Sequence, residues 1–226
     1  VKEAIRPGIS TKELDRIAHN YIISQGAEPA FLGYEGFSGS ICASVNEVLV
    51  HGIPSSEVIL KEGDIITIDV GAIYKGYYSD HAWTYPVGKI SEEAQHLLDV
   101  TEEALFAGIE QAVAKNRIGD IGHAIMKVVE PFNYGLPIEY TGHGIGRTMH
   151  EAPYVPNVGV PGKGARLRKN MVIAIEPMVQ LGTRRTKTLD DGWTVVSEDE
   201  KLTAHFEHTV LILDDVYTTG RTIFHA

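Results

Sequence analysis

Apolar positions recur along the chain at two spacings. Residues three and four apart are apolar over residues 10–26, 91–115 and 120–131, whereas most of the remaining segments are extended and rich in β-branched residues. Ser10 and Glu13 form a capping box at the start of the first helical segment. Ser91 opens the longest segment, and Asp120 is expected to cap the third. The pattern therefore predicts three helices among strands and turns.

Two of the extended segments repeat each other. They read "LKEGDIITIDVGA" from Leu60 and "LRKNMVIAIEPMV" from Leu167, and each carries one carboxylate, Asp69 and Glu176, at the same place. The offset is 107 positions without a gap. Burying an unpaired carboxylate costs several kcal/mol, roughly, so each acid needs a partner. Two halves of like design explain the pattern most simply. Chance similarity of two buried strands is the alternative.

The first carboxylate has an acidic neighbour across a predicted hairpin. "IITIDVGAIYKGYYSD" should turn at Lys75-Gly76, which places Asp69 opposite Ala82. Asp80 is then two residues from the partner position, on the same face and on the diagonal. Two acids converging in this way are expected to share a cation.

Four acids and one imidazole can gather if the two halves face each other: Asp69, Asp80, Glu176, Glu207 and His143. Oxygen-rich ligation with one nitrogen suits Mn, Fe or Co, and four carboxylates are more than one ion needs. Two ions can hold a hydroxide and polarise a carbonyl, which is hydrolytic chemistry. The alternatives are a hairpin-edge acid, capped or lysine-paired acids and an ordinary core imidazole.

Composition narrows the class of protein. The 226 residues are 43% apolar and carry a formal charge of −10, which disfavours nucleic acid and anionic membrane surfaces as partners. Cys42 is the single cysteine and no apolar run approaches the roughly 20 residues of a membrane span, so a cytoplasmic protein is expected. The repeat also predicts a helix ahead of the first one, with residues 1–5 as its tail.

Five separated motifs resemble those of type I, bacterial-type methionine aminopeptidases. They are "NEVLVHGIPS", "IDVGAIYKGYYSDHAWTYPVG", "TGHGIGRTMHEAPYVPN", "IAIEPMV" and "DGWTVVSEDEKLTAHFEHTVLI", in family order from about Pro7 to Leu213. The resemblance implies the pita-bread fold, an α+β architecture of two pseudo-symmetric αβ halves with antiparallel sheets covered by helices. It also implies removal of N-terminal methionine from nascent polypeptides by a hydroxide held at a dinuclear metal site.

The same resemblance distributes the metal ligands. Asp69 and Glu176 would each serve mainly one ion, and His143 would bind alongside Glu176. Asp80 and Glu207 would bridge the two ions. The implied cofactors are two divalent ions per chain, with Co, Mn, Fe and Zn all open.

Three catalytic roles are also implied by resemblance. Glu176 would carry a proton as well as bind metal, and His150 would donate a hydrogen bond to the scissile carbonyl as negative charge develops. His51 would contact the substrate backbone near the leaving amide; the alternative is a turn histidine before Gly52.

A pocket for the methionine side chain follows from the same mapping. Its residues would be Tyr34, Phe37, Cys42, Met149 and Trp193, with Phe31 at the rim. Aromatic and sulfur-containing walls suit a thioether, and plain core packing is the alternative for each residue. Phe31 stands where several relatives have a small thiol, Met149 where many have phenylalanine, and His205 where a glutamine is common.

The sequence predicts one catalytic domain over residues 1–226, with halves of about 1–88 and 89–226. A monomer acting on nascent chains, at the ribosome or after release, is expected. Proline dipeptidases and Xaa-Pro aminopeptidases share the fold and ligand set and are the alternative enzymes. A metal-free binding module of that fold is the alternative outside catalysis, although such proteins lose ligands that this chain keeps.

Overall fold

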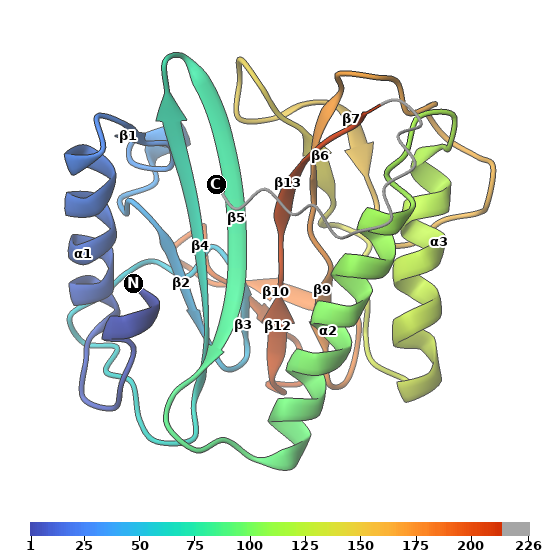
Figure 1. The fold of residues 1–226 in the computed structure, drawn as a ribbon. Coiled ribbons are helices and arrows are strands. Elements are labelled where there is room, and N and C mark those ends of the chain that lie inside the picture. Colours follow the sequence, from blue (N-terminus) through green and yellow to red (C-terminus); the bar gives the residue numbers. More distant parts are fainter. Residues whose placement is uncertain (214–226) are drawn as a thin grey trace.

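A long hairpin stands at the centre of the molecule, with helices to either side of it (Figure 1). The structure, a computed structural model, describes residues 1–213. The α-helices are α1 (Thr11–Ser24), α2 (Glu92–Glu110) and α3 (Ile118–Val129), and the short 3-10 turns are η1 (Lys2–Ala4), η2 (Tyr34–Gly36) and η3 (Glu130–Phe132). Within the described residues, no helix combines the length and apolar character that crossing a bilayer requires.

The strands form two larger antiparallel sheets and two small ones. Their bounds are β1 Glu28–Pro29, β2 Cys42–Val45, β3 Val48–Val50, β4 Ile65–Tyr74, β5 Tyr77–Pro86, β6 Gly142–Gly144, β7 Glu151–Val155, β8 Val172–Ile175, β9 Met178–Gln180, β10 Thr186–Thr188, β11 Val195–Ser197, β12 Thr203–His205 and β13 His208–Leu211. In the first sheet β1, β2 and β5 pair with β4, and the second has the order β13-β8-β6-β7. The small sheets are β10-β11-β3 and β12-β9.

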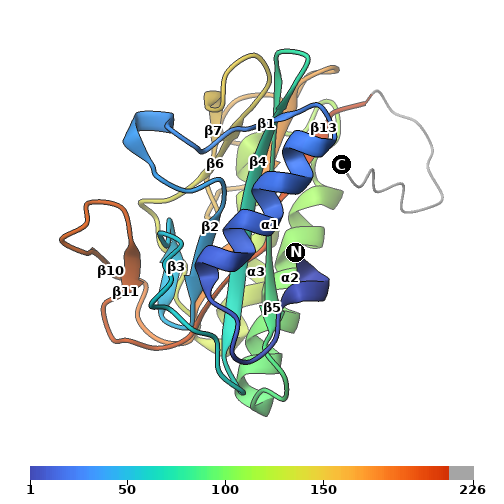
Figure 2. The ribbon, with the colours of Figure 1, turned by 90° about the vertical axis from the view of Figure 1, so that its left-hand side faces the viewer.

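All three helices lie on one side of the sheets, and β3, β10 and β11 lie on the other (Figure 2). Leu14 and Ala18 of α1 pack with Ile66 and Ile68 of β4 in one apolar cluster. A larger cluster holds the buried faces of α2 and α3 against the second sheet. The site described below lies on the opposite side of the sheets.

The sequence repeat is present in the backbone. An isolated antiparallel bridge joins Ser10 to Ile59, and another joins Arg117 to Arg166; both partners are shifted by 107 positions. Helices α1 and α3 begin at residues 11 and 118, the same shift again. The two halves are therefore built alike from the first helix to the buried carboxylate.

The predicted cap of the third helix was wrong. Arg117, the equivalent of Ser10, is the N-cap of α3, and Asp120 is the third helical residue. The Asp120 carboxylate accepts a hydrogen bond from the Arg117 N–H at 2.7 Å, as the third residue of a capping box does. In α1, by contrast, Ser10 does cap the helix by accepting from the N–H of Glu13.

The longest helix ends earlier than its apolar spacing predicts. Helix α2 stops at Glu110, where Gln111 and Ala112 donate to the carbonyls of Gly108 and Ile109. Lys115, the predicted end of the helix, instead donates its backbone N–H to the Leu167 carbonyl and has φ 86°. Gly8, which is 107 positions earlier, makes the same bond to Leu60 at φ 88°. Tertiary pairing thus overrides helical propensity here. The helix expected ahead of residue 1 stays a prediction.

The central hairpin has the predicted register. Lys75 and Gly76 both have positive φ, 52° and 78°, as a two-residue turn of this kind requires. Asp69 pairs with Ala82, and Asp80 pairs with Gly71.

The two halves are joined where β5 meets β13. The N–H of Asp80 donates to Thr209 Oγ1 at 3.0 Å, and the Thr209 hydroxyl donates to the Asp80 carbonyl at 2.8 Å. The N–H of Glu207 donates to the Ala82 carbonyl at 2.8 Å. These bonds place the carboxylates of the first sheet beside those of the second.

Candidate active site and metal centre

A cavity of about 300 Å³ is lined by residues from both halves. It brings together every residue that the sequence predicted for the site: Phe31, Tyr34, Phe37, Cys42, His51, Asp69, Asp80, His143, Met149, His150, Glu176, Trp193 and Glu207. The cavity has an ionic floor of carboxylates and imidazoles and an apolar wall beside it.

The four carboxylates come from equivalent strands of the two sheets. Asp69 and Asp80 lie on β4 and β5, Glu176 follows β8 directly, and Glu207 directly precedes β13. Asp80, Glu176 and Glu207 are 6%, 9% and 1% exposed. Asp69 is half-buried, and its Oδ1 is fully buried without a hydrogen-bond partner. Sheet pairing therefore concentrates negative charge at one buried place.

In the part of the chain that the structure describes, no lysine or arginine pairs with this charge. Within residues 1–213, the side-chain ion pairs of these carboxylates involve histidines alone. Burial raises the pKa of Asp80 to about 7, and it raises the pKa of Asp69, Glu176 and Glu207 well above their usual values. The ionised forms are consequently unstable unless a cation binds among them.

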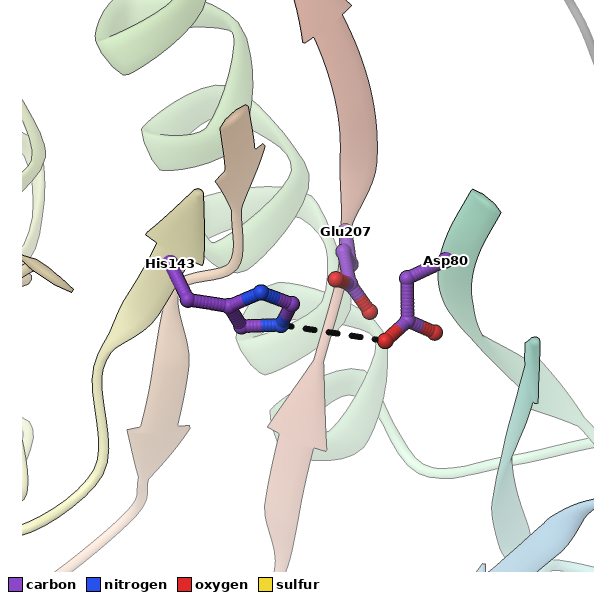
Figure 3. A group of neighbouring side chains, drawn as sticks. All are labelled: Asp80, His143 and Glu207. Atoms are coloured by element: carbon purple, nitrogen blue, oxygen red, sulfur yellow. Dashed lines mark ion pairs between the residues drawn. The ribbon is translucent and has the colours of Figure 1, made fainter. Parts of the chain in front are cut away.

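His143 faces the carboxylates with a free lone pair (Figure 3). Its Nδ1–H donates to the Gly144 carbonyl at 2.9 Å, which leaves Nε2 unprotonated. This Nε2 lies 3.8 Å from Asp80 Oδ2 and 3.6 Å from Glu176 Oε1. Burial lowers the pKa of His143 to about 4, so the ring is neutral at physiological pH. A neutral imidazole oriented by a backbone carbonyl is a typical metal ligand.

Two groups of possible ligands share one residue. Asp80, His143 and Glu207 offer atoms that lie within 4.8 Å of one another, and so do Glu176, His205 and Glu207. Carboxylate oxygens with imidazole nitrogen suit a divalent transition metal. The donor set and its unsatisfied buried oxygens thus fit the divalent ions that the sequence predicted. Asp69 belongs to neither group, although its carboxylate is within hydrogen-bonding reach of Asp80.

The apolar wall stands directly beside the ionic floor. Cys42 pairs with Asp69 across β2 and β4, and burial raises the pKa of its thiol well above the usual value, which keeps it neutral. Phe37 and Trp193 meet edge to face at 5.1 Å between ring centroids. Met149 is 3% exposed and belongs to the same cluster. A neutral, polarisable pocket therefore adjoins the carboxylates.

Phe31 is more buried than the predicted rim position suggests. It is 8% exposed and packs on Gly71, where an added Cβ would lie only 2.7 Å from the Phe31 ring. Gly71 is the β4 residue opposite Asp80. The glycine thus lets an aromatic ring close one side of the cavity next to an acid.

Two further histidines stand between the floor and the wall. The Tyr34 hydroxyl lies 2.9 Å from His150 Nδ1, and the His150 ring is 4.4 Å from that of His143. The His51 ring lies edge-on to Trp193, with 6.2 Å between centroids. Burial lowers the pKa of both His51 and His150, so both rings are neutral at physiological pH.

The remaining lining residues had no predicted place in the site: Glu35, Val50, Glu139, Tyr140, Thr141, Met178 and His205. In the sequence, His205 stands out only as a departure from the family pattern. Glu35 could have been noticed in the sequence, because the segment "GYEG" indicates a turn. In the structure Glu35 adopts φ 48°, which is rare outside glycine. Met178 is two residues after Glu176 and could have been found by proximity.

Comparison with known proteins identifies the family of this chain. Residues 1–214 match the model of metallopeptidase family M24. The chain belongs to this family. Methionine aminopeptidase 1 of Bacillus subtilis is 56% identical over 95% of this chain and 86% of its own length. Methionine aminopeptidase of Clostridium acetobutylicum is 52% identical over the same shares. The resemblance drawn from the five motifs is confirmed.

M24 structures confirm the pita-bread fold. The crystal structure of methionine aminopeptidase from Thermotoga maritima matches with a TM-score of 0.93 and 43% identity, over 95% of this chain and 86% of that one. The prolidase of Pyrococcus furiosus matches with a TM-score of 0.74 and 24% identity, over 94% of this chain and 55% of that one. The second likeness is one of fold alone.

Proposed function

We propose that this M24 metallopeptidase is a methionine aminopeptidase, which hydrolyses the bond after the N-terminal methionine of nascent polypeptides. One observation carries the proposal: a neutral pocket with sulfur and aromatic walls opens directly onto a buried cluster of carboxylates and imidazole. The high identity to named methionine aminopeptidases supports the substrate.

Two divalent ions, of Co, Mn, Fe or Zn, would be held by Asp69, Asp80, His143, Glu176 and Glu207. When bound, such ions activate water and polarise the scissile carbonyl. Asp80 and Glu207 lie at the junction of the two sheets, and each would serve both ions.

Protein side chains would transfer the proton and recognise the scissile carbonyl. Glu176, whose burial raises its pKa, is suited to accept a proton from water and pass it to the leaving amine. We assign Tyr34 as the donor to His150 Nδ1, which leaves the proton of this neutral ring on Nε2. His150 can then donate to the carbonyl oxygen as negative charge develops. His51 would contact the substrate backbone.

Substrate selection would come from the apolar wall. Phe31, Tyr34, Phe37, Cys42, Met149 and Trp193 would enclose the methionine side chain. An unbranched thioether gains dispersion and S–aromatic contacts there. We further propose that the second residue of the substrate must be small.

The cellular setting follows from the substrate. We propose a cytoplasmic monomer, acting as one catalytic domain over residues 1–226, that meets new N-termini at the ribosome or after their release. The formal charge of −10 argues against binding nucleic acid directly.

Proline-specific peptidases of the same fold are the second candidate enzymes. The weaker likeness to the prolidase, 24% identity with a TM-score of 0.74, makes them less favoured than methionine aminopeptidases. A non-catalytic binding module is disfavoured because the complete set of buried carboxylates and His143 is kept.

Peptide hydrolysis tests the proposal. Chelator-treated protein, reloaded in turn with Co, Mn, Fe and Zn, should cleave Met-Ala-Ser with at least one of them and leave Ala-Pro-Ala and Met-Leu-Ser largely intact. Preference for Ala-Pro-Ala would indicate the proline-specific alternative. Equal rates on Met-Ala-Ser and Met-Leu-Ser would contradict the small second residue, and no cleavage with any of the four metals would contradict the enzyme itself.

A further inference from the structure

His205 is a buried imidazole that the proposed mechanism does not use. It is the last residue of β12 and is 2% exposed. Its Nε2 lies 3.4 Å from Glu176 Oε2 and 3.9 Å from Glu207 Oε2, and within residues 1–213 neither ring nitrogen has a hydrogen-bond partner. Buried polar groups are nearly always hydrogen-bonded, so this ring calls for an explanation.

The backbone holds His205 firmly in this position. Its N–H donates to Thr84 Oγ1 at 3.0 Å, and its carbonyl accepts from the same hydroxyl at 2.9 Å. Across the small sheet it pairs with Met178, another residue of the cavity. The ring is therefore fixed toward the carboxylates by paired strands rather than by its own contacts.

Glu176 lies between two imidazoles. His143 Nε2 is 3.6 Å from one of its oxygens, and His205 Nε2 is 3.4 Å from the other. Two ligand atoms bound to one ion at about 2.1 Å are roughly 3.0–3.4 Å apart at ordinary coordination angles. The spacing of His205 and Glu176 falls at the upper end of that range. A cation shared by them would use the Nε2 lone pair and separate it from the two carboxylates.

We propose that His205 is a sixth protein ligand of the metal centre, completing a second nitrogen-containing group with Glu176 and Glu207. The proposal rests on the metal-dependent function above. The ion held by Glu176 would then have an imidazole on either side of this carboxylate, His143 and His205. The added nitrogen shifts that position toward Co, Fe or Zn relative to Mn, because imidazole is a softer donor than carboxylate.

Cobalt binding to chelator-treated protein tests the assignment without relying on activity. Titration calorimetry with Co(II) is compared for wild type, His205→Gln and a control, His96→Gln, which makes the same change on the exposed side of α2. Glutamine keeps a hydrogen-bonding group near Glu176 but removes the imidazole. Proton NMR of the cobalt-loaded proteins counts the paramagnetically shifted, exchangeable imidazole N–H signals.

His205→Gln should weaken one of two cobalt sites on the order of 10- to 100-fold and lose one shifted N–H signal, with His96→Gln like wild type. Unchanged cobalt affinity and an unchanged set of signals would overturn the proposal. A loss of turnover with both readouts unchanged would also overturn it, since His205 would then only position Glu176.

The experiment separates this inference from the proposed function. Wild type that binds no divalent ion would overturn both, whereas two bound ions with an unaffected His205→Gln variant would overturn the sixth ligand alone. Should His205→Gln fail to fold, wild type labelled with 15N-histidine and loaded with Zn decides the matter. One coordinated imidazole nitrogen beyond that of His143 supports the proposal, and no additional one refutes it.

Discussion

The two pairs of carboxylates at the site come from repeated halves but have different surroundings. Asp69 and Asp80 lie diagonally across a continuous hairpin, where Asp69 pairs with Cys42 and Ala82 and Asp80 pairs with Gly71. Glu176 and Glu207 stand at strand ends, and Glu176 has imidazoles on either side. The repeat thus copies the positions of the acids, while the nitrogen donors come from the second half alone.

An excursion in the second half accounts for part of this difference. Asp69 and Glu176 are 107 positions apart, but Asp80 and Glu207 are 127 apart. The additional residues form the β10–β11 hairpin between β9 and β12. It carries Trp193 to the cavity. The second half therefore supplies a wall residue, Trp193, from a hairpin for which the first half has no counterpart, and substitutions in the two halves should have unequal effects.

The largest expected effect is that of Asp80→Asn. This change removes charge from the residue at the junction of the halves, so one metal should be lost and turnover should fall by at least on the order of a thousandfold. Metal analysis and Met-Ala-Ser hydrolysis measure both. Asp99→Asn, on the exposed side of α2, is the matched control. Near-normal turnover of Asp80→Asn with two metals per chain would contradict the dinuclear site as assigned, with Asp80 as a shared ligand.

A smaller effect is expected at the contact between Tyr34 and His150, which come from different halves. His150→Ala should lower kcat about 10²–10³-fold at unchanged metal content, because the developing charge loses its donor. Tyr34→Phe should lower kcat only about tenfold, since the His150 ring remains and only the tautomer of that ring is no longer fixed. Equal losses in the two variants would contradict the proposed direction of this hydrogen bond.

Metal-free protein should become less stable as pH rises from 7 to 8.5. Burial raises the pKa of Asp69, Glu176 and Glu207 well above their usual values, so the folded state holds protons that the unfolded state has released. Asp80, with a pKa of about 7, contributes only at the start of this window. The lowered pKa values of His143 and His205 act below about pH 6.5, outside this window. Each kcal/mol lost lowers Tm by about 2–4 °C in a protein of this size.

Calorimetric melting of chelator-treated protein at several pH values measures this effect. Saturating Mn should abolish the decline, because the ionised carboxylates then have a cation. A Tm that is constant or rises between pH 7 and 8.5 without metal would mean that the four acids already have partners in the folded protein.

The smallest effect is expected in the apolar wall. Met149→Phe should change KM for methionyl peptides by no more than about tenfold, because apolar exchanges of similar volume usually cost under about 1.5 kcal/mol. Steady-state kinetics on Met-Ala-Ser measures it. A loss comparable to that of His150→Ala would show that Met149 has a more direct part in the reaction.

Local patterns predicted those parts of the fold that depend on neighbouring residues. The Lys75-Gly76 turn fixed the register of Asp69 and Asp80, and the shift of 107 positions held in the backbone. The prediction was wrong where a distant contact decides the outcome. Lys115, expected at the end of α2, pairs with Leu167 instead, and the apolar spacing of the segment does not reveal this contact.

The candidate site could likewise be predicted where local spacing decides the position of a residue, and not where distant contacts do. The carboxylates and His143 could be found because strand spacing and motif order identify them. The surroundings of His205 depend on β12 pairing with β9 and on Thr84, which is 121 residues away. Such contacts are set by tertiary structure, and the sequence alone gave this histidine no role.

The hydrogen bonds between Asp80 and Thr209 also bear on the order in which the chain can fold. They join residues 129 positions apart, and β13 lies near the end of the described chain. Closing so long a loop is slow compared with forming the β4–β5 hairpin, whose turn is two residues. During synthesis, the first hairpin can form well before its partner strand leaves the ribosome. We therefore expect the four carboxylates to converge only after β13 has been made, so that the growing chain cannot assemble the complete metal centre before that strand is available.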